Sequence, residues 1–246
     1  MLGTCKLCRK ENRELQESHY MPAALYPKTV KLEYLPSNGQ PLKEITDVLL
    51  CFDCEQCFNR RGESEVLRYI AAKIAKKPIP LVAKLEPSIV QEGDKTLKSY
   101  DGSEIGLNMD MFAYFALSMA WRGTHSWPIC GSKHTTPIRL GFYEEPIRRF
   151  LAEETMDFPS ETSVIVIVCT DKESREAWFL PTQCDDVWFH DIRVLALGLF
   201  FRVVLGRSIP DVLKTDSCHA DGKRIHLGDA SEKTRQALAY TESLSC

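Results

Sequence analysis

Two cysteine pairs of Cys-x-x-Cys spacing constrain the fold of this chain more than any other feature. The first pair is Cys5 with Cys8, and the second, far along the chain, is Cys51 with Cys54. Four thiolates can bind one Zn²⁺ tetrahedrally, and a closed site of this kind contributes folding free energy directly. The spacing therefore predicts a small zinc-built domain over residues 1–78.

A second choice of ligands exists, because Cys54 and Cys57 have the same spacing. We favour Cys51 with Cys54, since the apolar Leu49 and Leu50 lead directly into Cys51 as a strand leads into a zinc knuckle. Cys57 is then expected inside the helix that begins at the knuckle. Reduced, buried cysteines without a metal are the alternative interpretation of all these residues.

The ten cysteines also raise the alternative of a secreted disulfide protein. The first residues contain no basic stretch followed by an apolar run, so we expect no signal peptide and a cytoplasmic protein. In a reducing compartment, this cysteine spacing favours metal over disulfides. The longest apolar run, residues 192–205, is interrupted by Arg193 and Arg202, so we expect no membrane-spanning segment.

The net charge of −3 is unevenly distributed along the 246 residues. Residues 1–77 contain thirteen Lys and Arg against ten Asp and Glu, whereas the rest contains eighteen against twenty-four. The cysteine-rich end is therefore the better place for an anionic partner such as DNA, although its excess of positive charge is small.

The remainder of the chain predicts an α+β fold in which a mixed helix and antiparallel-sheet domain, residues 104–246, follows the zinc domain. Residues 79–103 contain prolines, glycine and lysines and are predicted to be a linker. Residues 192–205 suit either one buried helix or two strands that meet near Gly198, and we favour strands because the run is aromatic and β-branched. Apolar periodicity predicts helices over 55–77, 108–122 and 144–154, and composition predicts further strands over 163–169, 177–180, 187–189 and 224–227.

Between the cysteine pairs lies Ser18-His19-Tyr20-Met21-Pro22. A knuckle, a His-x-x-Pro segment and an apolar Leu-Leu-Cys-x-x-Cys that opens a helix together resemble the treble-clef zinc finger of HNH-type nucleases. The resemblance covers roughly the first 75 residues. The family has Asp before the histidine, Asn before the second knuckle, and His or Asn after its last cysteine. This chain has Ser18, Thr46-Asp47 and Glu55 at those positions.

The resemblance implies single-metal hydrolysis of a phosphodiester. His19 would be the general base, and Glu55 would bind a catalytic Mg²⁺ or Mn²⁺. Asn59 would share a helix face with Glu55, and Glu63 lies one further turn along. The basic residues of the same helix, Arg60, Arg61 and Lys73, are the expected phosphate contacts.

Two functions from different classes remain open. The first is a metal-dependent endonuclease acting on DNA, whose C-terminal domain selects the substrate, docks a partner protein or forms a homo-oligomer. Family analogy would make it an effector subunit of a bacterial defence or mobile-element system. The second is a catalytically inactive zinc-finger adaptor that binds nucleic acid or a partner protein, which the acidic C-terminal part favours.

The C-terminal part contains two further groups of potential metal ligands, but neither has matched pair spacing. Its tryptophans are expected in the core or in an interface. The two groups are His125, Cys130 and His134, and then Cys184, Cys218, His219 and His226, while the tryptophans are Trp121, Trp127, Trp178 and Trp188.

Overall fold

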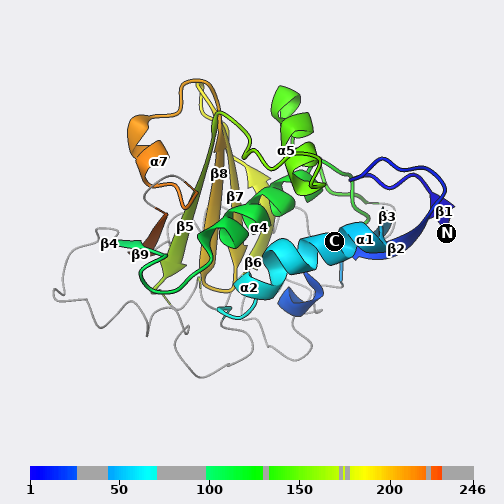
Figure 1. Cartoon of the computed structure of the whole chain (residues 1–246), viewed down its shortest axis with the longest axis horizontal. Helices are drawn as coiled ribbons and strands as arrows, with labels where there is room; N and C mark the ends of the chain where they lie inside the picture. Colours follow the sequence, from blue (N-terminus) through cyan, green and yellow to red (C-terminus); the bar gives the residue numbers. More distant parts are fainter. Residues whose placement is uncertain are drawn as a thin grey trace.

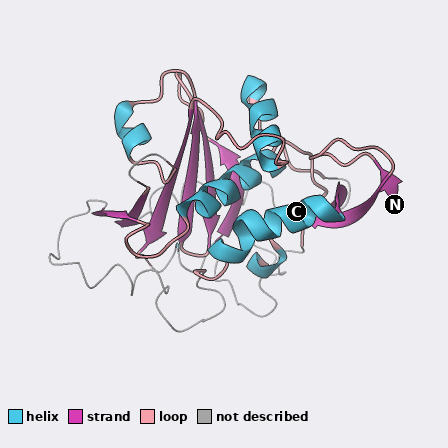
Figure 2. Ribbon diagram, viewed as in Figure 1, coloured by secondary structure: helices cyan, strands magenta, loops and turns pink. Residues whose placement is uncertain are grey.

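A computed structural model of the chain combines helices with two β-sheets (Figure 1, Figure 2). It describes residues 1–26, 44–70, 98–129, 133–171, 174, 178–219 and 223–228. The predicted features that fall outside these residues are Lys73, Cys130, the end of the helix over 55–77 and most of the linker over 79–103.

The N-terminal sheet is antiparallel and has the order β1-β2-β3. Its strands are β1 (Leu2–Gly3), β2 (Arg13–His19) and β3 (Thr46–Cys51). In the β2–β3 pair, Leu15 lies opposite Cys51 and His19 lies opposite Thr46. The second cysteine knuckle and His19 therefore lie at opposite ends of the same hairpin.

A continuous helical segment follows β3 and packs against the rest of the protein. It comprises α1 (Phe52–Phe58), the π-helical η2 (Asn59–Glu63) and α2 (Ser64–Val66). It begins at Phe52, earlier than the predicted residue 55, because Cys51 is extended and the chain turns helical directly after it. At Gly62, a Cβ atom would lie 3.0 Å from the backbone nitrogen of Phe115, so glycine permits close helix packing here.

The larger sheet has the strand order β4-β9-β5-β8-β7-β6. Every neighbouring pair is antiparallel except β5 with β9, which is parallel. The strands are β4 (Lys98–Asp101), β5 (Thr162–Cys169), β6 (Trp178–Gln183), β7 (His190–Ala196), β8 (Leu199–Leu205) and β9 (Arg224–Gly228).

The ambiguous run over 192–205 is a hairpin of two strands, as predicted. Leu197 and Gly198 connect β7 to β8 and have φ angles of 45° and 96°. Positive φ at both central residues matches the twist of a two-residue hairpin, and glycine adopts it without a Cβ penalty.

Helix α4 (Met109–Arg122) lies at the centre of the fold. Its side chains are buried almost all round, because the β5, β7 and β8 face of the sheet packs on one side and η2 and α2 on another (Figure 1). Asn108 caps the helix, since its side-chain oxygen accepts a hydrogen bond from Met111 N at 3.3 Å. The structure thus contains the helix that apolar periodicity predicted over residues 108–122.

The apolar core is shared by both parts of the chain. Leu7 and Phe58 from the N-terminal part belong to the same buried cluster as Phe115, Val166 and Phe201 from the C-terminal part. The division into a domain over 1–78 and another over 104–246 stays a prediction.

The remaining helices are short and lie outside the sheet. The turn η5 (Gly141–Tyr143) leads into α5 (Glu144–Leu151), and α7 (Asp211–Thr215) follows β8. None of the helices in the described part of the chain is long and apolar enough to span a bilayer.

One predicted strand, over residues 187–189, is wrong. These residues form a bend before β7, with Val187 88% and Trp188 71% exposed. Their aromatic and β-branched composition is typical of a strand, but the side chains of Val187 and Trp188 are exposed to solvent. Trp188 is therefore not a core residue, whereas Trp121, Trp127 and Trp178 are buried as predicted.

Candidate metal centre

The four predicted zinc ligands come from three elements of the N-terminal part. Cys5 and Cys8 lie in the tight turn between β1 and β2, Cys51 ends β3, and Cys54 lies in the first turn of α1. The turn is closed by backbone hydrogen bonds from Arg9 N to the Cys5 carbonyl, at 2.9 Å, and from Cys5 N to the Lys10 carbonyl, at 3.1 Å. The local fold therefore brings both pairs to one point.

The geometry of the four sulfurs fits a zinc ion. All four Sγ atoms lie within 4.8 Å of one another, and Cys8 Sγ and Cys51 Sγ are 4.0 Å apart. Tetrahedral Zn–S bonds of about 2.3 Å require sulfurs about 3.8 Å apart. Cys8 is half-buried and the other three are buried. Within the described residues, this is the only group of three or more His, Cys, Asp or Glu side chains close enough to bind one ion.

The protonation of the thiols also fits a cation at this point. The hydrogen bond between the thiols of Cys5 and Cys54 lowers the pKa of Cys5 to about 4 and raises the pKa of Cys54. Burial raises the pKa of Cys8. One thiolate thus opposes the ionisation of its neighbours, and a divalent cation would allow all four to ionise.

Cys57 does not belong to this cluster. Its Sγ lies 3.3 Å from the Tyr114 hydroxyl, which donates to the Leu151 carbonyl at 2.6 Å. Burial raises the pKa of this thiol. The structure thus places Cys51 and Cys54, and not Cys57, beside Cys5 and Cys8.

An arginine from the C-terminal part supports the first knuckle, a contact that sequence reasoning missed. Arg148 of α5 donates from Nη1 to the Leu7 carbonyl at 2.5 Å and also binds the carboxylates of Glu145 and Glu154. In the sequence, the only feature that pointed to this contact was the position of Arg148 next to the apolar Ile147 in a short predicted helix.

A carboxylate orients His19 at the end of the hairpin that lies away from the cysteine cluster. Its Nε2 lies 3.1 Å from Glu44 Oε2, and its ring centre is 6.2 Å from that of Tyr26. The imidazole is half-buried, with 26% of its side chain exposed. When Glu44 accepts the Nε2 proton, the Nδ1 lone pair is left to accept a proton. Glu44 was not among the predicted site residues, because the sequence did not give the register of the hairpin.

The polar residues beside His19 bind the backbone of the hairpin itself. Ser18, which is fully buried, accepts a hydrogen bond from Leu50 N at 3.2 Å. Asp47 accepts one from the nitrogen of the next residue, Val48, at 2.7 Å. Ser18 at the family's Asp position and Asp47 near its Asn position therefore stabilise local structure here.

Glu55 directly follows Cys54, the last cysteine of the cluster, on α1. Its Oε1 atom is buried and has no hydrogen-bond partner among the described residues. Asn59, one turn later, is exposed. No hydrogen bond or ion pair joins His19 to Glu55 within the described part of the chain. The role of these residues as one catalytic group stays a prediction.

The other charged residues of this helical segment have partners within the protein. Arg60 and Arg61 both reach Glu153, at 3.5 Å and 3.2 Å. Glu63 pairs with the buried Arg122 at 2.7 Å. Phosphate contacts by Arg60 and Arg61 would therefore compete with an internal carboxylate.

The two other predicted ligand groups are not brought together in the described residues. His134 is exposed, while His125 bonds the Thr124 hydroxyl and burial lowers its pKa. His226 Nε2 lies 3.0 Å from the Asp216 carbonyl, and Cys218 is fully buried.

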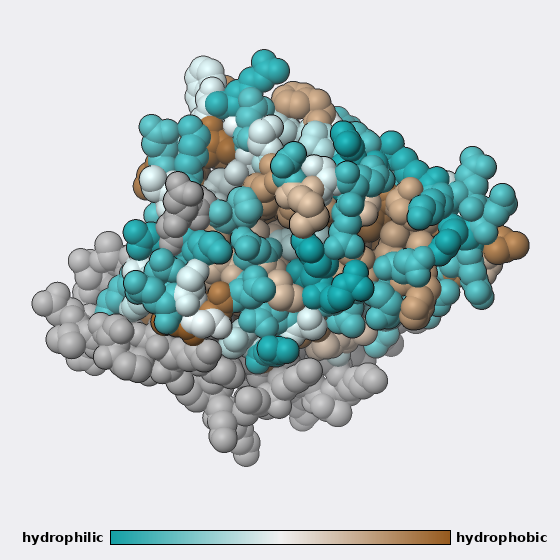
Figure 3. Space-filling view, in the orientation of Figure 1, coloured by the Kyte–Doolittle hydropathy of each residue, from teal (hydrophilic) through white to brown (hydrophobic). Residues whose placement is uncertain are grey.

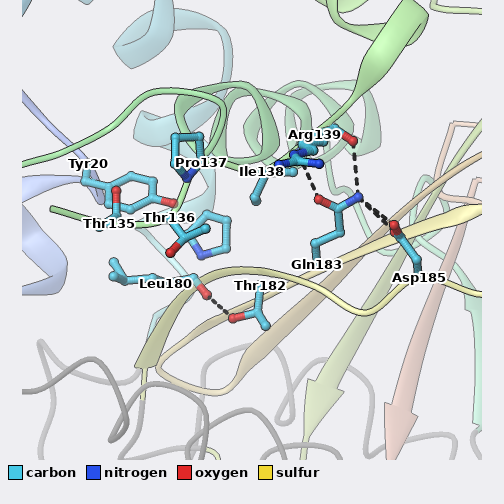
Figure 4. Close-up of a pocket in the computed structure, with 11 residues that line it drawn as sticks. Tyr20, Thr135, Thr136, Pro137, Ile138, Arg139, Leu180, Thr182, Gln183 and Asp185 are labelled. Atoms are coloured by element: carbon cyan, nitrogen blue, oxygen red, sulfur yellow. Dashed lines mark hydrogen bonds between the residues drawn. The ribbon is translucent and has the colours of Figure 1, made fainter.

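A pocket of about 390 Å³ lies between the end of the hairpin and the edge strand β6 (Figure 4). Tyr20 borders it on one side, stacked on Trp127 at 5.1 Å. On the other side, the Gln183 side chain accepts from Arg139 N at 2.8 Å and donates to the Arg139 carbonyl at 3.1 Å. The residues that line the pocket include threonine, proline and aliphatic side chains. This mixture does not indicate which class of ligand the pocket would bind.

Comparison with known proteins does not assign the chain. No protein-family model, no curated protein and no solved structure matches it.

Proposed function

We propose that the N-terminal part is a treble-clef zinc finger that acts as an HNH-like, metal-dependent endonuclease on DNA. The arrangement of a knuckle, a hairpin and a second knuckle at a helix start supports the treble clef. The observation that carries the nuclease function is the pairing of His19 with Glu44 at 3.1 Å. An imidazole held by a carboxylate through one nitrogen is the usual arrangement of a general base.

The chemistry assigned to His19 is removal of a proton from water. In the tautomer with its proton on Nε2, His19 donates to Glu44 Oε2 at 3.1 Å, and Nδ1 accepts the proton of the attacking water. The water oxygen then forms a bond to phosphorus as the bond from phosphorus to the leaving oxygen breaks, and the leaving oxygen takes a proton from solvent water. Glu44 also stabilises the imidazolium that results. Loss of the Nδ1 proton to solvent restores the neutral imidazole of His19.

Glu55 is the proposed ligand for a catalytic Mg²⁺ or Mn²⁺. Its buried Oε1 lacks a partner among the described residues, and a carboxylate oxygen is the donor that these cations prefer. A bound ion would supply positive charge to the scissile phosphate. Asn59, on the same helical segment as Glu55, is proposed as a further catalytic residue beside it.

The proposed DNA contacts are Arg60, Arg61 and Lys73. Arg60 is 66% exposed and 3.5 Å from Glu153, so its ion pair is weak and a phosphate can replace the carboxylate. The assignment to a bacterial defence or mobile-element system rests on family analogy alone.

A second candidate is an adaptor without catalytic activity. It is favoured by the use of Ser18 and Asp47 within the hairpin, because two positions of the nuclease pattern then serve local structure. In that function the zinc-built hairpin presents a binding surface, and His19 with Glu44 only orders its end.

The decisive experiment is nicking of a supercoiled plasmid with Mg²⁺ or Mn²⁺. His19→Ala and Glu55→Gln are expected to lower the rate by about 10²-fold or more, while each variant retains its zinc. His134→Ala is the control, because this histidine is exposed and lies outside the proposed nuclease site. Wild-type rates in both variants would refute the catalytic assignment. DNA binding without cleavage under either metal would establish the adaptor.

A further inference from the structure

Three large apolar side chains are exposed at one end of the larger sheet. They are Phe142 of η5, 67% exposed, and Val187 and Trp188 in the bend before β7, 88% and 71% exposed. This is the end where β7 begins and β8 ends (Figure 1). We call these three residues, with Arg207, the sheet-end patch.

The two parts of the sheet-end patch lie close together through Gly206 and Arg207. The Arg207 guanidinium lies 5.7 Å from the centre of the Phe142 ring. Its neighbour Gly206 lies against the bend, since a Cβ at Gly206 would be 3.0 Å from the Trp188 carbonyl oxygen. Arg207 therefore joins the Phe142 side of the patch to the Trp188 side.

The bend that carries Trp188 is fixed by its own hydrogen bonds. Asp186 N donates to the Phe189 carbonyl at 3.0 Å, and Asp186 Oδ1 accepts from Trp188 N at 3.3 Å. Cys184 N donates to the Asp191 carbonyl at 2.8 Å and closes the base of the bend. An exposed aromatic side chain on such a fixed bend loses little conformational entropy when a partner binds.

Acidic side chains lie next to members of the patch. Glu161 contacts the Tyr143 hydroxyl at 3.3 Å, and Asp185 pairs with His190 at 3.1 Å. Arg207 pairs with Glu161 at 3.8 Å and offsets the charge of that carboxylate. The other carboxylates remain in excess over the nearby arginines. The carboxylates are Glu144, Glu161, Asp185 and Asp186, against the guanidinium groups of Arg139 and Arg207.

An apolar centre with an acidic rim selects the chemistry of its partner. Apolar contact area and aromatic anchors provide most of the free energy of association, and Trp is prominent among such anchors. The negative rim attracts Lys and Arg and repels phosphates, which disfavours nucleic acid at this end of the molecule. Beyond residue 77 the chain has eighteen basic and twenty-four acidic residues. This net negative charge also disfavours nucleic acid and favours a basic partner.

We propose that the sheet-end patch docks a basic segment of a partner protein. The segment places an aliphatic or aromatic side chain against Trp188 and Phe142, and its flanking Lys or Arg side chains face Asp185, Asp186 and Glu144. The proposal does not depend on nuclease activity, because it uses neither His19 nor the zinc ligands.

The test is selection of binders from a random dodecapeptide library displayed on phage, with the full chain as the target. We expect selected peptides to share an apolar residue flanked by Lys or Arg. Trp188→Ala and the double charge reversal D185K/D186K should each weaken their binding by about tenfold or more. Phe52→Ala is the matched control, since this exposed aromatic residue lies on α1, and should bind as wild type.

Results of three kinds would overturn the proposal. One is a set of selected peptides without basic residues, or with unchanged affinity for Trp188→Ala. Another is binding of oligo(dT) that Trp188→Ala abolishes, which would make the patch a nucleic-acid surface. The third is a wild-type dimer that Trp188→Ala converts to a monomer, which would make a second copy of this chain the occupant. Unchanged thermal unfolding of each variant shows that the fold is retained.

Discussion

Arg148 donates a hydrogen bond from Nη1 to the backbone carbonyl of Leu7 at 2.5 Å, across 141 positions of sequence. Leu7 lies between the predicted zinc ligands Cys5 and Cys8, so this contact ties α5 to the first cysteine pair. Only 6% of the Arg148 side chain is exposed, and Glu145 and Glu154 bind the same guanidinium. The turn that carries Cys5 and Cys8 thus depends on a residue of the C-terminal part for its support.

Arg148→Ala is expected to lower the free energy of unfolding by about 2–4 kcal/mol. The change leaves the Leu7 carbonyl unpaired and removes the cation between two carboxylates. Urea denaturation measures the loss. Arg149→Ala is the control, because Arg149 is 54% exposed and 3.8 Å from Glu154, and it should cost less than about 0.5 kcal/mol. Equal losses in both variants would show that the Arg148 contacts contribute nothing specific.

The same cluster predicts a dependence of stability on pH. Hydrogen bonds from Arg148 hold the pKa of Glu145 and that of Glu154 below the usual glutamate value. Their stabilising contribution is therefore complete above the pKa of the unfolded chain and is lost as the pH falls through the lower folded values. Between about pH 5 and pH 3, wild type should lose more unfolding free energy than Arg148→Ala. Parallel losses would contradict this, since protonation of the cysteines is common to both proteins.

Local signals predicted the elements of the fold that form from neighbouring residues. The spacing of apolar residues and the Asn108 cap define α4, and the run over 192–205 contains β8, most of β7 and the glycine of their turn. The bend at Trp188 misled the prediction, because composition cannot distinguish a buried aromatic residue from one held in solvent. Exposure is decided by tertiary packing, which a short window of sequence does not contain.

The metal centre was more predictable than the rest of the site. The spacing of Cys5, Cys8, Cys51 and Cys54 alone implied one cluster, because thiolate geometry demands it. The partner of His19 was not predictable, since Glu44 reaches it only through the pairing of two strands. Contacts of this kind depend on register, and nothing in the sequence around Glu44 marks it.

Metal analysis of cysteine variants tests the choice of zinc ligands. Purified wild type should contain about one Zn²⁺ per chain, and Cys8→Ser should contain less than about 0.2, because a structural zinc site needs all four ligands. Cys57→Ser should retain the full content, since the Cys57 thiol contacts Tyr114 instead of the cluster. Loss of zinc from Cys57→Ser with retention in Cys54→Ser would reverse the assignment.

Glu63 compensates the charge of Arg122, which is 2% exposed and has Nε and Nη1 without partners among the described residues. Glu63→Gln is therefore expected to lower the free energy of unfolding by about 3–5 kcal/mol, because it leaves a buried cation unpaired. Glu65→Gln on the neighbouring turn is the matched control. Its partner Arg68 is 70% exposed and remains hydrated, so the cost should stay below about 1 kcal/mol.

The double variant E63Q/R122M separates the two explanations of such a loss. If the unpaired charge is the cause, replacing Arg122 by an apolar side chain of similar length should restore part of the stability that Glu63→Gln removes. If packing of the Glu63 side chain against α4 is the cause, the two losses should add. Additive losses in urea denaturation would therefore contradict the role of Glu63 as the counter-charge of Arg122.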